Sequence, residues 1–390
     1  MSFFKGTERL TDSFITEQEF VDAFIGGQLK NWGLSTNGRL GDNNSITRSS
    51  PVQTVAAGVN WVIISGGGSA TNGVKAGIKT DGTLWLWGDN TSGQLGNSTS
   101  ITRSSPVQTV STGTNWKSIS FNENFPIAVK TDGTLWLWGG NANGRLGLNT
   151  SVNVFHSSPV QTVATGTNWC TAAGGVSMAA AIKSDGTLWL WGVNTSGHLG
   201  DNTIITKSSP VQTVATGTNW SKVGTESCGT ASAIKSDGTL WLWGGNGNGT
   251  IGDNSSINKS SPVQTVATGT NWKSVSSGGV TAGLKRDGTL WMWGLGSGGG
   301  LGDNSSINKS SPVQTVATGT NWKIACAGQT AVVGAIKTNG TLWMWGCNSV
   351  GGGLGDNSSI TKSSPVQTVI GGTNWKSIVP GLSSLALENC

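Results

Sequence analysis

One seven-residue string, SSPVQTV, recurs along this chain and constrains its fold more than any other feature. It occurs seven times, at intervals of about 52 residues, and an Asn-Trp pair follows each copy. Six copies of [DN]GTLW[LM]WG come next in their repeats, and a damaged copy, GQLKNWG, stands near the start of the chain. Self-similarity at such a period indicates an architecture in which each repeat is one structural unit packed against its neighbours.

Each repeat contains four short segments with strand character. In one repeat they are residues 262–266, 272–276, 281–285 and 289–293. An Asp-Gly pair between the second and third segments favours a hairpin turn. In TLWLW the Leu and Trp side chains alternate, so both faces of the strand are apolar and both need covering. Four-stranded blades arranged around an axis meet that need, and four strands per repeat are typical of a propeller.

The two ends of the chain supply complementary parts of one more blade. Residues 385–390, LALENC, align with a second strand, and residues 27–33, GQLKNWG, align with a third strand. Pairing of these strands removes the free sheet edges. The sequence therefore predicts an all-β fold, a seven-bladed propeller over residues 26–390, closed by its N- and C-terminal strands.

The segments after the third strand resemble the regulator of chromosome condensation repeat family. Its signature is a DG turn, an apolar strand ending in WG, and then N-x-x-G-x-L-G; here residues 87–96 read WGDNTSGQLG and residues 191–200 read WGVNTSGHLG. The resemblance covers residues 26–390 and implies a seven-bladed propeller. The chain departs from the family because the His of its G-x-x-H-T element is missing from every repeat, and the long hairpin of its nucleotide-exchange member is absent. These departures argue against nucleotide exchange and chromatin binding.

Composition argues against most kinds of chemistry. All 20 Trp fall in repeat register, which favours core packing over ligand stacking. His156 and His198 are the only two His, and neither has the nucleophile and orienting acid of a triad. The net charge of +5 is scattered rather than clustered, and no apolar run reaches the roughly 20 residues of a membrane span. We therefore expect no enzyme, cofactor, metal, nucleic-acid partner or membrane insertion.

A basic residue precedes SSPVQTV in nearly every repeat, and sevenfold symmetry would spread these residues as a ring. The ring would serve solubility or attract an anionic partner. Its predicted members are Arg48, Arg103, Lys207, Lys259, Lys309 and Lys362, with His156 at the seventh position.

Comparison of the repeats with one another predicts which face would bind a partner. The second-to-third and fourth-to-first connections share one face and are nearly invariant, whereas the first-to-second and third-to-fourth connections share the other face and vary. Loops on a rigid scaffold often carry function, although drift in unconstrained loops would produce the same variation. The candidate binding residues on the variable face are Ser69, Asn72, Asn122, Asn124, Phe125, Arg39, Arg145, His156 and His198.

Residues 1–25 form a leader of different composition. Thr16 and Glu19 make a capping box, which predicts a helix too short to be stable alone. Its apolar residues would dock on the propeller's own side or on another chain: Phe20, Val21, Phe24 and Ile25. The pattern T-E-x-E-F-V-D-x-F-I resembles leaders of virion-associated repeat proteins of marine tailed phages.

Two functional readings follow. The first is a non-enzymatic interaction or structural propeller in a virion, assembled in the host cytoplasm and held by its leader to a phage capsid or tail. Its partners would be other virion proteins, with a host surface or glycan facing the variable loops. The alternative is a soluble cytoplasmic protein-binding or inhibitory module, resembling the propeller-type β-lactamase inhibitor of this family.

Overall fold

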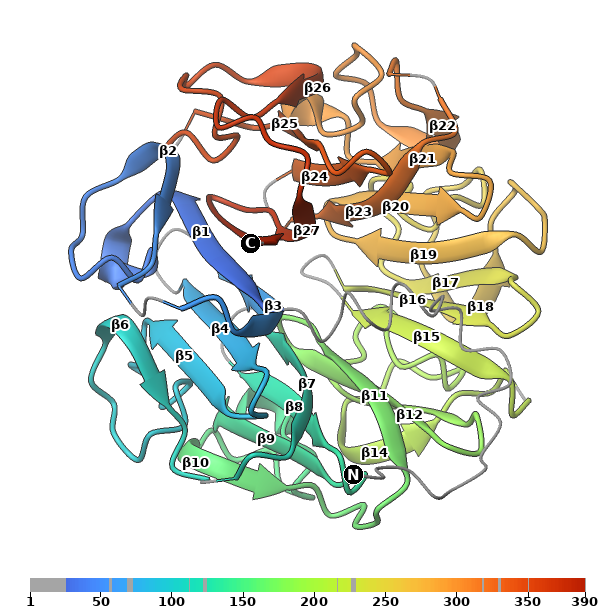
Figure 1. The fold of residues 1–390 in the computed structure, drawn as a ribbon. Helices are drawn as coiled ribbons and strands as arrows, with labels where there is room; N and C mark the ends of the chain where they lie inside the picture. The colour runs from blue at the N-terminus through green and yellow to red at the C-terminus, as the bar shows by residue number, and fades with distance from the viewer. Residues whose placement is uncertain are drawn as a thin grey trace, which may run out of the picture.

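The computed structural model describes residues 26–55, 58–68, 73–111, 113–121, 125–215, 217–225, 229–317, 319–328, 331–349 and 351–389. Within these ranges the chain is all-β, with three short 3₁₀ turns: η1 (Thr36–Gly38), η2 (Ala142–Gly144) and η3 (Ser297–Gly299). The strands form five four-stranded antiparallel sheets and one eight-stranded sheet. Figure 1 shows these sheets arranged as blades around a common centre.

Each repeat builds the same four strands. The first strands begin at the Trp after Asn and lie nearest the centre (Figure 1): β3 (Trp61–Gly67), β7 (Trp116–Phe121), β11 (Trp169–Gly174), β15 (Trp220–Thr225), β19 (Trp272–Ser277), β23 (Trp322–Ala327) and β27 (Trp375–Val379). The second strands are β4 (Val74–Lys79), β8 (Pro126–Lys130), β12 (Met178–Lys183), β16 (Thr230–Lys235), β20 (Val280–Lys285), β24 (Val332–Lys337) and β28 (Ser383–Asn389).

The third strands carry the LWxWG sequence, and the fourth strands lie farthest from the centre. The third strands are β1 (Gly27–Gly33), β5 (Leu84–Gly88), β9 (Leu135–Gly140), β13 (Leu188–Gly192), β17 (Leu240–Gly244), β21 (Leu290–Gly294) and β25 (Leu342–Gly346). The fourth strands are β2 (Arg48–Gln53), β6 (Arg103–Gln108), β10 (Phe155–Gln161), β14 (Lys207–Gln212), β18 (Lys259–Gln264), β22 (Lys309–Gln314) and β26 (Lys362–Gln367). Each fourth strand begins at or next to the basic position and ends at Gln, two residues before the predicted end.

The eight-stranded sheet contains both ends of the described chain. Strand β1 pairs with β28 over seven residues, from Gly27 opposite Asn389 to Gly33 opposite Ser383. On its other side β1 pairs with β2, and a single bridge from Gly27 to Trp61 links it to β3. The predicted pairing of the N- and C-terminal segments is therefore confirmed.

The Asp-Gly turn is built from side-chain hydrogen bonds that extend into the sheet. Asp81 Oδ1 accepts from the backbone N–H of Thr83 (2.9 Å) and from its hydroxyl (2.6 Å), and Thr83 Oγ1 accepts from Trp85 Nε1 (2.9 Å). Asn339 replaces Asp in one repeat and accepts the same two bonds from Thr341. These bonds explain why the repeats keep Asp or Asn followed by Gly-Thr.

The Lys before each of these turns packs on tryptophan. Lys79 Nζ lies 4.9 Å from the Trp61 ring centroid and 4.4 Å from that of Trp85. The same pair of contacts recurs at Lys130, Lys183, Lys235, Lys285 and Lys337. Cation–π contact on two rings thus occupies the ammonium.

A recurrent indole hydrogen bond helps to join neighbouring repeats. The indole of the Trp before Gly donates to the backbone carbonyl of the residue before Leu-Gly in the preceding repeat, as in Trp243 Nε1 to His198 O (2.9 Å). The following glycine must be glycine, since Gly200 has φ of +63° and a Cβ there would lie 2.8 Å from Trp243 Nε1. The other six bonds join Trp32 to Gly353, Trp87 to Arg39, Trp138 to Gln94, Trp191 to Arg145, Trp293 to Thr250 and Trp345 to Gly300.

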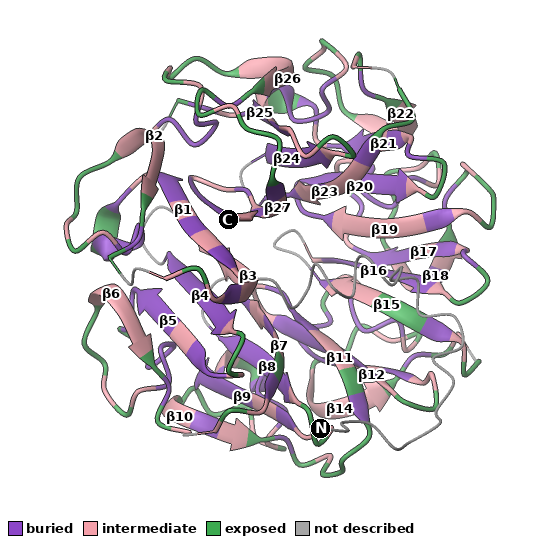
Figure 2. Cartoon of the chain, in the orientation of Figure 1, coloured by how far each residue is buried: buried purple, intermediate pink, exposed green. Residues whose placement is uncertain are grey.

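The apolar core lies between the sheets. Figure 2 shows buried residues along the second and third strands and exposed residues on the outer loops. Both faces of the third strand are covered, since Leu84, Leu86 and Trp87 are all fully buried. All 20 Trp are buried or half-buried, which confirms the prediction that they pack the core.

Candidate protein-binding surface

The structure places only part of the predicted variable-face set. Ser69, Asn72, Asn122 and Asn124 lie outside the described residues, as does the leader with Phe20, Val21, Phe24 and Ile25.

Four other predicted binding residues are buried rather than exposed. Phe125 has no exposed surface, and the exposed fractions of Arg39, Arg145 and His198 are 1%, 7% and 9%. The prediction that these side chains lie on the surface of the variable face is therefore wrong. Only His156, at the start of β10, is half-exposed.

Oxygens of their own loops hold these buried polar residues, and Arg145 also reaches the next repeat. Arg39 donates to the carbonyl (2.9 Å) and hydroxyl (2.6 Å) oxygens of Thr36. Arg145 donates to the carbonyls of Gly140 (2.7 Å) and Val176 (2.9 Å). His198 Nδ1 lies 3.2 Å from Val193 O. Arg39, Arg145 and His198 share one repeat position, so their variation reflects packing against the next repeat.

Burial shapes the titration of these groups. Burial lowers the pKa of Arg39 to about 10, and the nearby Asp89 carboxylate opposes that shift. Burial also lowers the pKa of His198. On β4, burial and then the charge of Arg39 lower the pKa of Lys75 to about 7, and Lys75 Nζ donates to Ser383 O (2.6 Å). Desolvation disfavours the charged form of a base, which gives the direction of each shift.

The predicted basic ring contains local ion pairs in four repeats. Four of its members form ion pairs with an Asp six residues earlier: Arg48 with Asp42 (3.6 Å), Lys259 with Asp253 (3.2 Å), Lys309 with Asp303 (3.9 Å) and Lys362 with Asp356 (3.9 Å). Among the described residues, Arg103 and Lys207 have no such ion pair. Four of the six basic members are therefore paired locally, and the role predicted for the ring stays a prediction.

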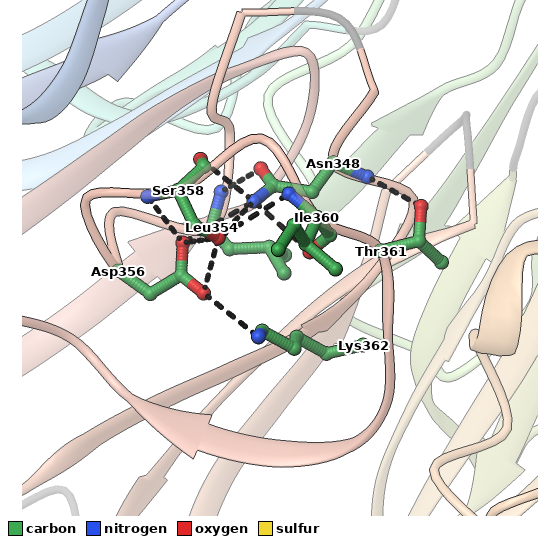
Figure 3. Close-up of polar contacts among 7 residues, drawn as sticks. All are labelled: Asn348, Leu354, Asp356, Ser358, Ile360, Thr361 and Lys362. Carbon is green, nitrogen blue, oxygen red and sulfur yellow. Dashed lines mark hydrogen bonds and ion pairs between the residues drawn. The ribbon is translucent and has the colours of Figure 1, made fainter.

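The third-to-fourth connection is a rigid loop built around one buried asparagine (Figure 3). Asn348 Oδ1 accepts from the N–H of Leu354 (3.1 Å). Its Nδ2 donates to the carbonyls of Ser358 (2.9 Å) and Ile360 (3.3 Å) and to Asp356 Oδ1 (3.2 Å). The same arrangement occurs around Asn90, Asn141, Asn194 and Asn246.

Each of these loops presents an exposed aliphatic side chain, which sequence reasoning missed. Ile360 is 65% exposed, although its backbone N–H and carbonyl are both hydrogen-bonded within the loop. The same repeat position is 58–68% exposed throughout. We call these residues the rim aliphatic set: Ile46, Ile101, Val152, Ile205, Ile257, Ile307 and Ile360. The sequence does contain a signal for this set, because an apolar residue stands two positions before the basic residue in most repeats.

A second exposed set lies beyond the other end of the fourth strand. Its members are 43–52% exposed and are called the strand-end valine set: Val55, Val110, Val163, Val214, Val266, Val316 and Val369. The two sets are separated by the length of the fourth strand, about 16 Å for six residues. They can therefore be altered independently.

Several kinds of site are not found in the described part of the chain. No group of three His, Cys, Asp or Glu residues lies close enough there to hold a metal ion. No helix there has the length and apolar character needed to span a bilayer.

The blades, the DG turns and the N-x-x-G-x-L-G loops define a β-propeller of repeated four-stranded blades. Residues 81–128 and 132–182 match the family model "Regulator of chromosome condensation (RCC1) repeat". Two repeats of the chain therefore match the RCC1 repeat family, and the other repeats share their sequence pattern.

Curated relatives agree with this assignment. The chain is 28% identical to the Arabidopsis thaliana ultraviolet-B receptor UVR8 over 60% of its own length and 53% of the receptor. It is 29% identical to the mouse E3 ubiquitin-protein ligase HERC2 over 53% of its own length and 4% of that protein. The chain therefore spans about half of the receptor and a small part of the ligase.

Solved structures share the fold. Prp20p from Saccharomyces cerevisiae, described with its binding to Gsp1p and histones, has a TM-score of 0.82 at 17% identity, covering 96% of this chain and 95% of that one. Human WBSCR16 has a TM-score of 0.80 at 17% identity, covering 93% of this chain and all of that one. At these identities the likeness concerns the fold alone.

Proposed function

We propose that this chain is a non-enzymatic protein-binding propeller that contacts its partner through the rim aliphatic set. The observation that supports this proposal is that the third-to-fourth loops, five of them fixed by a buried asparagine, hold apolar side chains in water. Burial of these side chains against a partner would remove apolar surface from water, which favours association. A rigid loop also loses little conformational entropy when it binds.

The surroundings of these residues suit a protein partner. In four repeats, an ion pair lies beside the aliphatic residue, as Asp253 and Lys259 do beside Ile257. Protein interfaces combine an apolar centre with a polar edge. The structural relative Prp20p is a protein-binding propeller by its description with Gsp1p and histones, which supports the same class of function here.

We further propose that the ring has seven blades and is closed. The eight-stranded sheet would then be two blades, β27-β28-β1-β2 and β3-β4-β5-β6, joined only by the Gly27–Trp61 bridge. The seven-residue β1–β28 ladder and the Trp32-to-Gly353 bond support this proposal. A closed ring would hold the binding loops at fixed positions relative to one another.

Two matched triple variants test the binding surface. One replaces Ile257, Ile307 and Ile360 by Ser, and the other replaces Val266, Val316 and Val369 by Ser. Each exposed substitution should change stability by no more than about 0.5 kcal/mol, so both proteins should fold. Wild type and variants are immobilised, and the proteins each captures from a lysate of the source cells are compared.

The proposal expects a partner held by wild type and by the valine variant but lost from the isoleucine variant. Equal capture by all three proteins, or loss only from the valine variant, would place binding elsewhere.

As a more specific role, we propose that the propeller is displayed on a phage particle and docked there through its leader. The support is the sequence of residues 1–25 alone, with its apolar Phe20, Val21, Phe24 and Ile25. The alternative, a soluble cytoplasmic inhibitory module, is favoured by the binding surface, which needs no leader.

Light scattering of the full chain and of a chain beginning at Gly26 separates these readings. If the full chain self-associates while the shorter chain is a folded monomer, the result supports docking through the leader. Identical monomers exclude self-association through the leader and favour the soluble module.

A further inference from the structure

The first strands enclose a cavity at the centre of the molecule. Its volume is about 650 Å³, and β3, β7, β11, β15, β19, β23 and β27 all contribute to its wall. Figure 1 shows these strands around the centre of the propeller. Ligand pockets commonly have volumes of about 300–1,000 Å³. The cavity is therefore the size of a small-molecule site.

One wall of this cavity is cationic. Lys222, Lys273, Lys323 and Lys376 line it, and they come from four successive first strands. Lys222 Nζ donates to Lys273 O (2.6 Å), and Lys273 Nζ donates to Lys323 O (3.4 Å). Each of these two ammonium groups thus reaches the backbone of the next lysine.

The cavity wall supplies no acidic side chain to balance this charge. No Asp or Glu is found among its lining residues in the described part of the chain. Within that part, Lys323 forms no ion pair, whereas Lys309 on the outer strand pairs with Asp303. Like charges gathered in a concave site with low-dielectric walls raise the local potential and attract anions.

We infer that the cationic wall binds a small, multiply charged anion of the oligophosphate class. Several ammonium groups from successive strands match a ligand that carries several negative charges. Lysine is a common phosphate binder because its ammonium is a compact point charge with three donors. An anion there would relieve the repulsion among the lysines.

This inference is independent of the proposed protein-binding function. The lysines lie at the start of the first strands, where the fourth-to-first connections arrive. The rim aliphatic set lies at the opposite end of the blades. One site can therefore fail while the other is retained.

Calorimetric titration of the full chain with sodium tripolyphosphate tests the inference. Wild type should bind the probe with an affinity that falls as salt is added. The variant K273Q/K323Q should bind at least about tenfold more weakly, since it removes two charges from the wall. The control K259Q/K309Q removes two charges from outer strands and should change affinity less than about twofold. Thermal melts check that both variants fold.

Three outcomes would overturn the inference. The first is no binding of tripolyphosphate by wild type. The second is equal weakening in both variants, which would mean attraction to overall charge. The third is binding of a deca-glutamate peptide, but not of tripolyphosphate, in a manner that requires Lys273 and Lys323; the site would then take acidic peptides.

Discussion

Substitution of Gly200 by Ala tests how neighbouring repeats are joined. Gly200 has φ of +63°, and its Cβ would lie 2.8 Å from Nε1 and 3.1 Å from Cδ1 of Trp243. That indole donates to His198 O, which couples two repeats. Gly371 is a matched control because its φ is +64° and no atom lies within 4 Å of the Cβ position.

The expected difference in stability between the two variants follows from which costs they share and which they do not. Both substitutions place Ala in the left-handed region, at a cost of about 1–2 kcal/mol. Both also reduce the entropy of the unfolded chain by a similar small amount. Only Gly200→Ala overpacks a buried site, at about 1–3 kcal/mol. It also displaces an indole hydrogen bond worth about 1 kcal/mol. We expect Gly200→Ala to be less stable than Gly371→Ala by about 2–4 kcal/mol.

Guanidinium unfolding followed by tryptophan fluorescence measures this difference. The midpoint for Gly200→Ala should fall well below that for Gly371→Ala, and the control should fall below wild type only by the smaller cost of the left-handed backbone conformation. Equal midpoints would refute the reasoning, because the indole contact would then add nothing to the cost of the backbone conformation.

Three further predictions concern single residues. The pKa of Lys75 is lowered to about 7 from 10.5, so the native state releases its proton before the unfolded state does. Wild type should therefore gain stability as pH rises from about 7 to about 10, and thermal melts of Lys75→Met should lose that gain; an unchanged profile would contradict it. Asn348→Ala leaves three backbone groups of its loop without a partner, which should cost about 2–4 kcal/mol. Hydrogen exchange at the Leu354 N–H should quicken, and unchanged protection would count against the loop's rigidity. Hydrogen bonds from Thr239 lower the pKa of Asp237, so its stabilising contribution is present near neutral pH and is lost as pH falls through its native pKa. Asp237→Asn should keep the two hydrogen bonds from Thr239, as Asn339 keeps those from Thr341, so stability near neutral pH should fall only slightly and the loss on acidification below about pH 4 should be smaller; an unaltered acid melt would contradict this.

The repeated elements were predictable because their signals are local. SSPVQTV marks the fourth strand and Asp-Gly-Thr marks the turn before the third. The terminal pairing was predictable since β28 and β1 each resemble a different strand of the same repeat. Alternation of Leu and Trp in TLWLW showed that both faces of the sheet are covered, and Leu86 and Trp87 are fully buried.

The candidate site was harder to predict because it depends on how each loop folds back on itself. Arg39 and His198 look like surface residues in a variable loop, but backbone carbonyls hold them in the interior. The Asp six residues before Lys259 is visible in the sequence, yet only the loop's fold brings the two charges together. Ile360 is exposed because Asn348 fixes the backbone on both sides of it.

Hydrogen–deuterium exchange of the captured complex tests most directly the claim that the rim aliphatic set forms the binding surface. The account predicts that the partner protects loop residues 253–258, 303–308 and 356–361, and leaves the DG turns at 236–239 and 286–289 unchanged. Protection of the DG turns with unaltered exchange in the three loops would contradict it, since the partner would then bind the opposite end of the blades.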